Sequence, residues 1–415
     1  TRKGFKSYYH PFFSSSDDGS VRAFYQNATI RSKSFDVHAH PDSFFISNFL
    51  AKNMRAPLPE QSSNYETDYA YHFDAVGIGQ VLKEYSTKLG VAHIEDTVQE
   101  VIQAEDGHIT AVRSEKMGIT EAEFFVDCTG FSSQIICKKL NVPFISYKNM
   151  LFNDRAVAMP TPLPEDDNLP CQTISKAASS GWIWNIPLKN RFGNGYVYSS
   201  DFLDESQAEK ELRKHLGAED SDIEARHLKM RVGRLSHCWE KNCLAVGLSQ
   251  GFIEPLEATA LMVVQDTVEI FLENFVRGEL SNTYKDQAND KVNLIFDGIK
   301  NYIVTHYKLN SRSDTDYWIA NRENENISSE LKAIIDTWDK GGDLLGELKS
   351  QAATQVYSPT SWYCILAGMG RFPRKLKKPK KKFEVYNHKH TVDFCEQMMH
   401  LFPDHHSAIH NLGNT

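Results

Sequence analysis

Residues 242–278 constrain the fold more than any other stretch of the chain. NCLAVGL (242–248) is typical of a short buried strand that ends at Gly247. Apolar residues then recur at spacings of three and four, which is typical of an amphipathic helix, and Gly278 is a suitable helix end. The pattern predicts a strand, an irregular loop and a helix that begins near Glu257. Its apolar positions are Leu261, Val264, Val268, Phe271 and Phe275.

The loop before this helix carries two carboxylates. GFIEPLEATALMV (251–263) places Glu254 and Glu257 in a mostly apolar run without a nearby Lys or Arg. A charged side chain there costs free energy unless it is paired or exposed. A helix N-terminus offers unpaired N–H groups and partial positive charge, so Thr259 and Ala260 are placed to present amides to an anion. An ordinary capped helix fits the same spacing.

The segment before residue 131 predicts a helix, a hairpin and a buried strand. Asp74 is a suitable cap for a helix that ends at Gly90, with an apolar face at Val81, Leu82 and Tyr85. Alternation around Asp106-Gly107 (residues 91–114) predicts a hairpin. EAEFFVDCTG (121–130) then predicts a strand whose terminal Gly130 allows a ligand to approach the backbone closely, although a simple tight turn explains it equally.

Two aromatic groups are candidates for pocket walls. GWIWNIPL (181–188) predicts a strand with Trp182 and Trp184 on one face. SYYHPFF (7–13) contains His10 and Phe12 within a dense aromatic cluster that is suited to a flat ligand. Core packing is the alternative for both groups.

Composition excludes several classes of function. The net charge of −8 gives no overall attraction to nucleic acid or anionic lipid, and the basic run 371–383 is interpreted as a solvated segment. No apolar run approaches the ~18 residues of a membrane span. Seven scattered cysteines without a CxxC pair favour free thiols in a reducing, cytoplasmic compartment. We therefore expect neither a nucleic-acid nor a membrane partner.

One short motif suggests a metal site. Asp36-Val37-His38-Ala39-His40 resembles the first metal motif of amidohydrolases, because neutral His is a good zinc ligand. The chain does not show the eight strand–helix units that such a barrel needs. We therefore expect no metal and keep a metal-dependent hydrolase only as an alternative.

The order of the motifs resembles that of a known family. SYYHPF, YHFDA, DCTG, GWIWNIP, RFGNGYVYSS, RVGR, GLSQGFIEPLEAT and WYCILAGMG follow one another as in flavin-dependent halogenases of the tryptophan halogenase type. The resemblance covers roughly residues 7–375 and is strongest at the Trp-x-Trp-x-Ile-Pro and Glu-Pro-Leu-Glu elements. An FAD-dependent aromatic monooxygenase is the alternative with the same cofactor.

The resemblance implies a mixed α/β (α+β) fold with two modules. Residues 1–278 would form an FAD-binding module related to that of FAD monooxygenases, and 279–415 a mainly helical substrate module. The family opens with a strand–GxGxxG–helix that holds the FAD pyrophosphate. That segment does not occur in this sequence, so we expect it to precede Thr1.

The resemblance also implies a mechanism. A separate flavin reductase supplies FADH2, which reacts with O2, and a chloride or bromide ion is oxidised to hypohalous acid. The acid passes through an internal tunnel to a small aromatic substrate, where Glu257 assists as acid or base. The halide would lie at Thr259 and Ala260, and Trp182 and Trp184 would form the flavin-side wall. The residues expected to bind the cofactor are Val98, Gly130, Gly247, Leu248, Thr259, Ala260 and Leu261.

Departures from the family pattern bear on the substrate. The family's Ser-Thr-Gly after the second Glu is Ala258-Thr259-Ala260 here, and Ala still supplies an N–H. The catalytic Lys is either Lys3 or a residue upstream of the sequence. The Tyr-Tyr-Glu of enzymes acting on free tryptophan is missing, and Tyr357 stands where their Trp would be.

His10, Phe12 and Tyr357 are therefore expected to line the substrate site. We expect an indole-like or phenolic substrate that is not strictly free tryptophan. The oligomeric state stays open, with a homodimer as one option.

Overall fold

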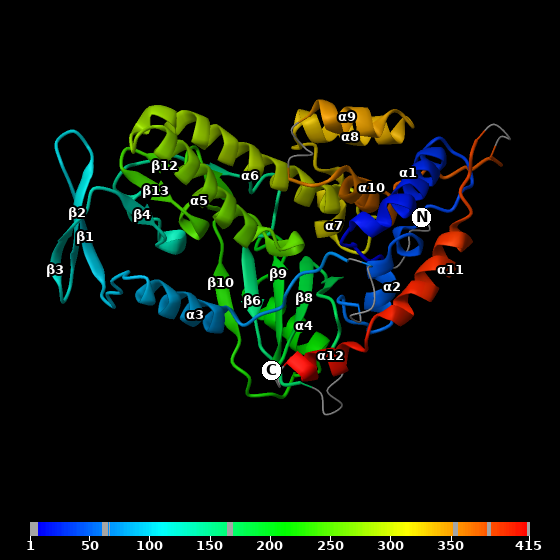
Figure 1. Ribbon diagram of the computed structural model, residues 1–415, viewed down its shortest axis with the longest axis horizontal. Coiled ribbons are helices and arrows are strands. Elements are labelled where there is room, and N and C mark those ends of the chain that lie inside the picture. The colour runs from blue at the N-terminus through cyan, green and yellow to red at the C-terminus, as the bar shows by residue number, and fades with distance from the viewer. Residues whose placement is uncertain are drawn as a thin grey trace. The chain divides into compact units, whose positions relative to one another are not determined.

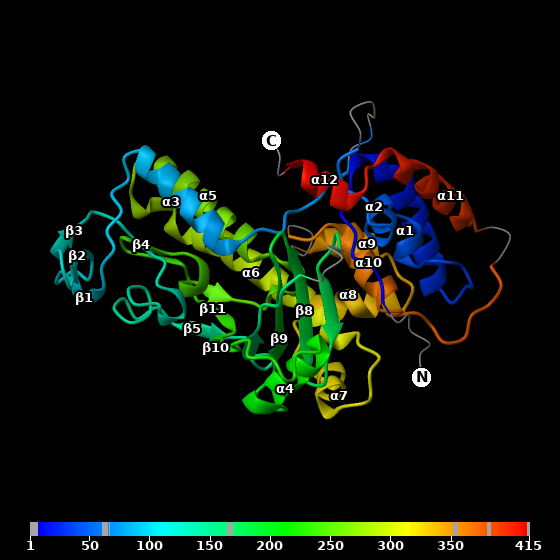
Figure 2. The same ribbon diagram turned by 90° about the horizontal axis from the view of Figure 1, so that it is seen from below.

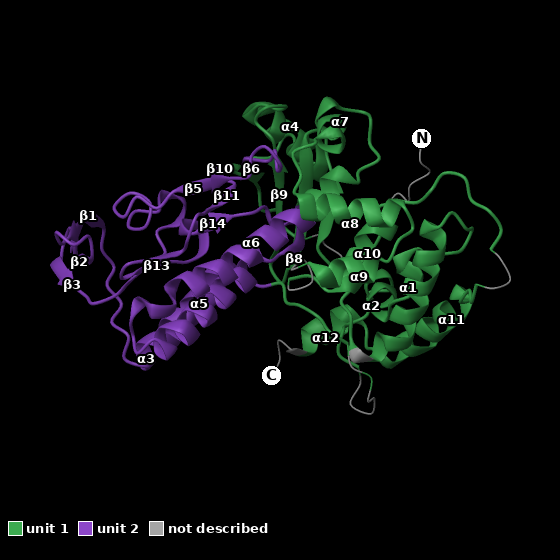
Figure 3. Cartoon of the chain, turned by 90° about the horizontal axis from the view of Figure 1, so that it is seen from above, with its two compact units in different colours: residues 1–72, 157–227, 304–415 green, residues 73–156, 228–303 purple. Residues whose placement is uncertain are grey.

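The computed structural model describes residues 7–59, 65, 67–163, 169–351, 356–379 and 383–412. Contacts between backbone positions divide the chain into two compact units, which Figure 3 shows in different colours. Unit 1 comprises residues 1–72, 157–227 and 304–415, and unit 2 comprises residues 73–156 and 228–303. The units are therefore discontinuous in sequence. The predicted division into an FAD-binding module (1–278) and a helical substrate module (279–415) stays a prediction.

Unit 2 contains three small sheets and three helices (Figure 1). One sheet is the antiparallel meander β1-β2-β3, another has the order β14-β11-β5, and the third has the order β12-β13-β4. Helix α6 leaves the unit near its C-terminal end. The elements are α3 (Ala75–Lys88), β1 (Val98–Gln103), β2 (Ile109–Ser114), β3 (Gly118–Glu121), β4 (Phe125–Asp127), β5 (Phe144–Ser146), β11 (Gly233–Leu235), β12 (Trp239–Glu240), β13 (Cys243–Ala245), β14 (Gly251–Phe252), α5 (Ala260–Arg277) and α6 (Lys285–Lys308).

Unit 1 consists of helices and most of a five-stranded sheet of order β10-β6-β9-β8-β7. The boundaries between the units fall within β6 (Arg155–Ala158) and β10 (Arg226–Lys229). The remaining elements are α1 (Asp18–Ser32), α2 (Ile46–Lys52), β7 (Ile174–Ala177), β8 (Gly181–Leu188), β9 (Arg191–Tyr198), α4 (Glu205–Leu216), α7 (Asp316–Glu323), α8 (Ser329–Asp339), α9 (Leu344–Ser350), α10 (Pro359–Gly368), α11 (His388–Met398) and α12 (His405–Leu412).

Several predicted elements are confirmed. The hairpin at Asp106-Gly107 joins β1 to β2, and Gly107 adopts the left-handed conformation that such a turn requires (φ 84°). The strand 181–188 is β8, which pairs with β9 in an antiparallel hairpin. Helix α4 lies against β9, as Figure 2 shows, and Ala208 and Leu212 of the helix share a buried cluster with Tyr196 of the strand.

Helix α3 forms where it was predicted, but its apolar face is not covered by the described residues. The Asp74 carboxylate accepts hydrogen bonds from the N–H groups of Val76 and Gly77 at 2.9 Å, which confirms the cap. None of the helix residues is buried, and Leu82 is 62% exposed. Exposed apolar side chains also lie on α5 (Leu261, Val268, Leu272 and Val276). Apolar side chains of unit 2 are thus exposed on both α3 and α5.

The core of unit 2 lies beneath its parallel strand pair. Strands β4 and β13 run parallel, with Phe125 opposite Cys243 and Asp127 opposite Ala245. Both strands contribute to one buried cluster, because their alternate residues face the same side. The cluster consists of Ile109, Phe125, Ile135, Ile136, Val142, Leu235, Cys243 and Ala245. This core fixes where the two strands end.

Candidate active site

The turn after β4 is organised by one buried carboxylate. Asp127 accepts hydrogen bonds from the backbone N–H groups of Thr129 (3.0 Å), Ile135 and Ile136 (both 2.9 Å). The chain therefore folds back around the carboxylate. It leaves Gly130 in a left-handed conformation (φ 68°) with open space around the position of a Cβ. Such a turn leaves room for a ligand to approach the backbone, and a cofactor contact at Gly130 stays a prediction.

A second glycine turn lies beside the first, at the end of β13. Gly247 is also left-handed (φ 70°), and Leu248 beside it is half exposed. The Ser249 hydroxyl donates to the carbonyl oxygen of Asp127, and the Ser133 hydroxyl donates to the carbonyl oxygen of Ser249 at 2.9 Å. These bonds join the two turns. The carboxyl ends of adjacent parallel strands are where α/β sheets bind nucleotide cofactors.

Helix α5 begins three residues later than predicted. It starts at Ala260, and Glu257 lies in a separate 3₁₀ turn, Pro255–Glu257. Ala258 follows in the left-handed region (φ 53°), which a residue with a Cβ adopts only at a cost. Pro255 and this reversal interrupt the helical path, so Glu257 is not in the first turn of α5. The half-buried Glu257 instead stands on the turn that leads into the helix.

The N-terminus of α5 provides donors for an anion. Thr259 occupies the N-cap position, and its side chain makes no capping hydrogen bond. Thr259 is half-buried, whereas Ala260 and Leu261 are exposed. A helix of 18 residues concentrates partial positive charge at these amides. The predicted halide residues therefore lie together with Glu257, within one short segment.

Val98 is the one predicted cofactor residue that belongs to another sheet. It begins β1, is half exposed, and lies opposite Ser114 of β2. The glycine turns instead follow strands of the β12-β13-β4 sheet. A cofactor contact by Val98 stays a prediction.

The two tryptophans that were predicted to form the flavin-side wall lie on β8, in unit 1. Trp182 and Trp184 project from one face of β8 with ring centroids 6.1 Å apart. Trp182 is buried, which favours core packing for this ring, and Trp184 is half-buried. The Trp184 ring covers Gly195 on β9 so closely that a Cβ there would lie 2.0 Å from it. Gly195 therefore determines where the Trp184 ring can lie.

The predicted substrate residues also lie in unit 1. His10 is half-buried and makes an edge contact with Tyr8, whose ring in turn packs against Gly368 at the end of α10. Phe12 is half exposed, and Tyr357 is buried just before α10. The structure thus brings the His10 segment to the α10 helix. Lys3 lies outside the described residues.

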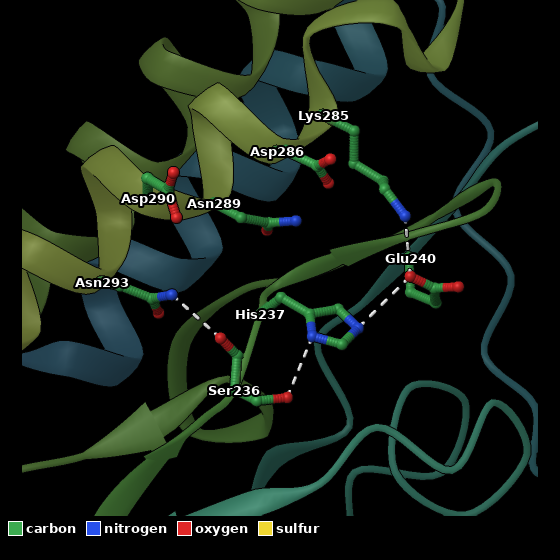
Figure 4. A pocket seen from close by; sticks show the side chains of 8 residues that line it. All are labelled: Ser236, His237, Glu240, Lys285, Asp286, Asn289, Asp290 and Asn293. Carbon is green, nitrogen blue, oxygen red and sulfur yellow. Dashed lines mark hydrogen bonds and ion pairs between the residues drawn. The ribbon is translucent and has the colours of Figure 1, made fainter.

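A polar pocket of about 250 Å³ lies in unit 2 (Figure 4). The Ser236 hydroxyl lies 2.9 Å from Nδ1 of His237, and Nε2 of His237 lies 3.2 Å from Glu240, which also binds Lys285 at 2.9 Å. None of the predicted site residues lines this pocket. Its complete lining is Ser236, His237, Glu240, Lys285, Asp286, Asn289, Asp290 and Asn293.

The histidines of the DVHAH motif are engaged with protein groups. The His38 ring stacks on His388 at 3.9 Å, and its Nε2 lies 2.9 Å from the Ser43 hydroxyl. Burial lowers the pKa of His38 to about 4, so the ring is neutral at pH 7. Among the described residues, the structure contains no group of three or more His, Cys, Asp or Glu suited to a metal ion.

Known proteins match this chain both in sequence and in fold. A family model for tryptophan halogenases matches residues 2–384. The chain therefore belongs to the tryptophan halogenase family, which confirms the resemblance and the expected mixed α/β fold.

Individual relatives cover the chain to different extents. Tryptophan 6-halogenase SttH from Streptomyces toxytricini is 38% identical over 282 residues, which are 68% of this chain and 54% of SttH. Tryptophan 7-halogenase RebH from Lentzea aerocolonigenes is 33% identical over 321 residues, which are 74% of this chain and 60% of RebH. The chain thus spans little more than half of the curated relatives it matches.

Solved structures of relatives match the fold more completely. The crystal structure of SttH superposes with a TM-score of 0.82 at 30% identity and covers 96% of this chain and 81% of that one. BrvH, a flavin-dependent halogenase from Brevundimonas sp. BAL3, gives a TM-score of 0.80 at 28% identity over 93% of this chain and 79% of that one. No helix among the described residues is long and apolar enough to cross a membrane.

Asp127→Asn should destabilise unit 2. The substitution replaces a buried acceptor of several backbone hydrogen bonds with an amide that presents donors to N–H groups, so we expect a loss of about 2–4 kcal/mol. Urea unfolding would measure it, with the exposed Asp220→Asn as the control that changes the midpoint little. Equal midpoints for both variants would contradict the role of Asp127.

Gly195→Ala should displace the Trp184 ring, because the new Cβ and the ring cannot occupy the same space. Gly193→Ala on the same strand is a matched control, since its nearest neighbour would be 3.8 Å away. We expect tryptophan fluorescence to shift in the first variant and not in the second. Identical spectra for both variants would mean that Gly195 does not determine the ring position.

Proposed function

We propose that this protein is a flavin-dependent halogenase that uses FADH2, O2 and chloride or bromide to halogenate an electron-rich aromatic substrate. The observation that carries the proposal is the segment from Glu254 to Ala260. This segment places the half-buried carboxylate of Glu257 beside the N-terminus of α5, which has no side-chain cap. It does so in a chain of the tryptophan halogenase family. The relatives SttH and RebH are named as tryptophan halogenases.

The two glycine turns fit a bound flavin. Gly130 leaves open space beside its backbone, and Gly247 follows the adjacent parallel strand. The two turns would hold FAD, together with Leu248 and the first residues of α5. When bound, FAD supplies the reaction with O2 that oxidises the halide to hypohalous acid. A separate flavin reductase would supply the FADH2.

The amides at the start of α5 would hold the halide. The N–H groups of Thr259 and Ala260 lie where the partial positive charge of the helix is greatest. A halide needs only hydrogen-bond donors and a positive electrostatic potential. Backbone amides supply both, whichever side chain the residue carries. Ala260 therefore serves as well as the family's Gly as a source of the N–H.

Glu257 would act on the aromatic ring. Addition of the halogen to a ring carbon gives a cationic ring, which a nearby carboxylate stabilises. The ring then loses the hydrogen of that carbon as a proton, and a carboxylate oxygen of Glu257 can accept it. In balance, the arene and hypohalous acid give the halogenated arene and water.

We assign the substrate to indole-like or phenolic arenes, not strictly free tryptophan. His10, Phe12 and Tyr357 offer aromatic surfaces on unit 1, and Phe12 is half exposed. The sequence lacks the Tyr-Tyr-Glu that holds free tryptophan in the family. Trp182 and Trp184 would keep the ring away from the flavin and so limit oxygenation.

A product analysis tests the proposal. The full-length protein is supplied with FAD, a flavin reductase, NADH and chloride or bromide, and is offered indoles, phenols and free tryptophan. Mass spectrometry should show a halogen isotope pattern on an indole or phenol, and none when the reductase is omitted. Products that gain only oxygen would support the monooxygenase alternative. Bound zinc without any product would support the hydrolase based on His38 and His40.

Glu257→Gln should reduce halogenation by about 10²–10⁴-fold, because the amide cannot accept the ring proton. FAD affinity should stay unchanged, since the glycine turns are not altered. Glu269→Gln, at an exposed position of the same helix, is the control. Steady-state product formation and flavin titration would measure both effects, and turnover near the wild-type rate would exclude Glu257 from catalysis.

A further inference from the structure

The proposed mechanism uses Glu257 and leaves the first carboxylate of the turn unexplained. Glu254 is only 1% exposed, although its neighbour Pro255 is exposed. Removing a carboxylate from water costs several kcal/mol unless hydrogen bonds compensate for it. Ending strand β14 does not by itself require a buried carboxylate at this position.

Glu254 is bound by a side chain from a distant part of unit 2. Nδ2 of Asn153 donates to Oε2 of Glu254 at 2.8 Å, and Asn153 is also only 1% exposed. The two residues are 101 positions apart in sequence. The bond therefore connects the catalytic turn to a separate loop, and water cannot easily replace it.

The loop that carries Asn153 is itself held in place. It follows β5, and the Tyr147 carbonyl accepts hydrogen bonds from the N–H groups of Met150 (2.8 Å) and Leu151 (2.9 Å). The Tyr147 hydroxyl donates to Asp297 on α6 at 2.8 Å. The amide of Asn153 is thus presented from a fixed backbone.

The turn that carries Glu257 is fixed on both sides of Glu254. On one side, β14 pairs with β11, with Gly251 opposite Arg234. On the other side, Pro255 restricts the backbone and Ala258 adopts the left-handed conformation. Between these two points, the buried hydrogen bond from Asn153 holds Glu254.

We infer that Glu254 and Asn153 are positioning residues, whose buried hydrogen bond fixes the turn that carries Glu257. This inference rests on the proposed function. Misplacing a catalytic group by about 1 Å can reduce the rate by about 10²-fold. The hydrogen bond therefore acts on catalysis through Glu257, without touching the substrate.

Two substitutions at Glu254 separate the hydrogen bond from the charge. Glu254→Leu has no acceptor and should reduce kcat for halogenation by about 10–100-fold, whereas oxidation of reduced FAD continues. Glu254→Gln keeps an oxygen that can accept from Asn153, so its kcat should stay within about threefold of the wild type. Equal losses in both variants would overturn the inference.

Asn153→Asp gives a pH-dependent test. Two carboxyl groups within hydrogen-bonding distance cannot both be ionised without repulsion, so they bond only while they share a proton. Halogenation relative to the wild type should therefore be highest at low pH and fall as pH rises. Asn141→Asp, at an exposed loop position, should show no such trend. A flat ratio for Asn153→Asp would contradict the assigned role.

A double substitution distinguishes positioning from general stability. If Glu254 acts through Glu257, adding Glu254→Leu to Glu257→Gln should cause little further loss of kcat, because groups that act as a unit are not additive. A merely structural contact would give two independent losses. Additive losses would overturn the inference.

Hydrogen exchange separates this inference from the proposed function. Exchange of the amides in residues 251–263, read by mass spectrometry, should increase in Glu254→Leu and stay near the wild-type rate in Glu254→Gln. This readout needs no turnover. Faster exchange in Glu254→Leu, in a protein that shows no halogenation, would support the ordering role although the proposed function had failed. Unchanged exchange in Glu254→Leu would overturn the ordering role, whatever the activity.

Discussion

The carboxylate of Asp127 is the interaction on which the candidate cofactor site depends. Its oxygens satisfy backbone N–H groups that would otherwise be buried without partners, and the chain after β4 can reverse only because they do. The backbone carbonyl of Asp127 accepts a hydrogen bond from the Ser249 hydroxyl, which holds the turn after β13 beside the turn after β4. The turns of two glycines at adjacent strand ends are thus both held by one residue, through its side chain and its backbone carbonyl.

Local patterns predicted local structure well, and their failures have physical causes. The capping carboxylate of Asp74 and the alternation of β8 are short-range signals, so α3 and β8 form where they were predicted. The start of α5 was misplaced because spacing does not reveal the left-handed Ala258. The roles of Asp127 and Asn153 were not predicted, because periodicity does not describe their hydrogen bonds. Asn153 binds a residue distant in sequence, and Asp127 binds a segment that folds back on it.

Family membership and local geometry support the halogenase proposal in different ways. The family match covers residues 2–384, which is nearly the whole chain. The geometry adds that the turn with Glu257 and the uncapped helix start are consecutive, so the proposed proton acceptor and the proposed halide amides lie within one short segment. The residues proposed to bind the substrate belong to unit 1, and the turn that carries Glu257 belongs to unit 2.

The contact between Trp184 and Gly195 has a consequence for how sequences of this kind can diverge. A larger residue at position 195 is excluded while the indole ring lies over it, and the ring keeps its place only while position 195 has no side chain. Position 195 therefore cannot gain a side chain first without displacing the ring. A lineage that replaces the tryptophan with a smaller residue releases the glycine to vary, so the order in which the two substitutions occur is restricted to one direction.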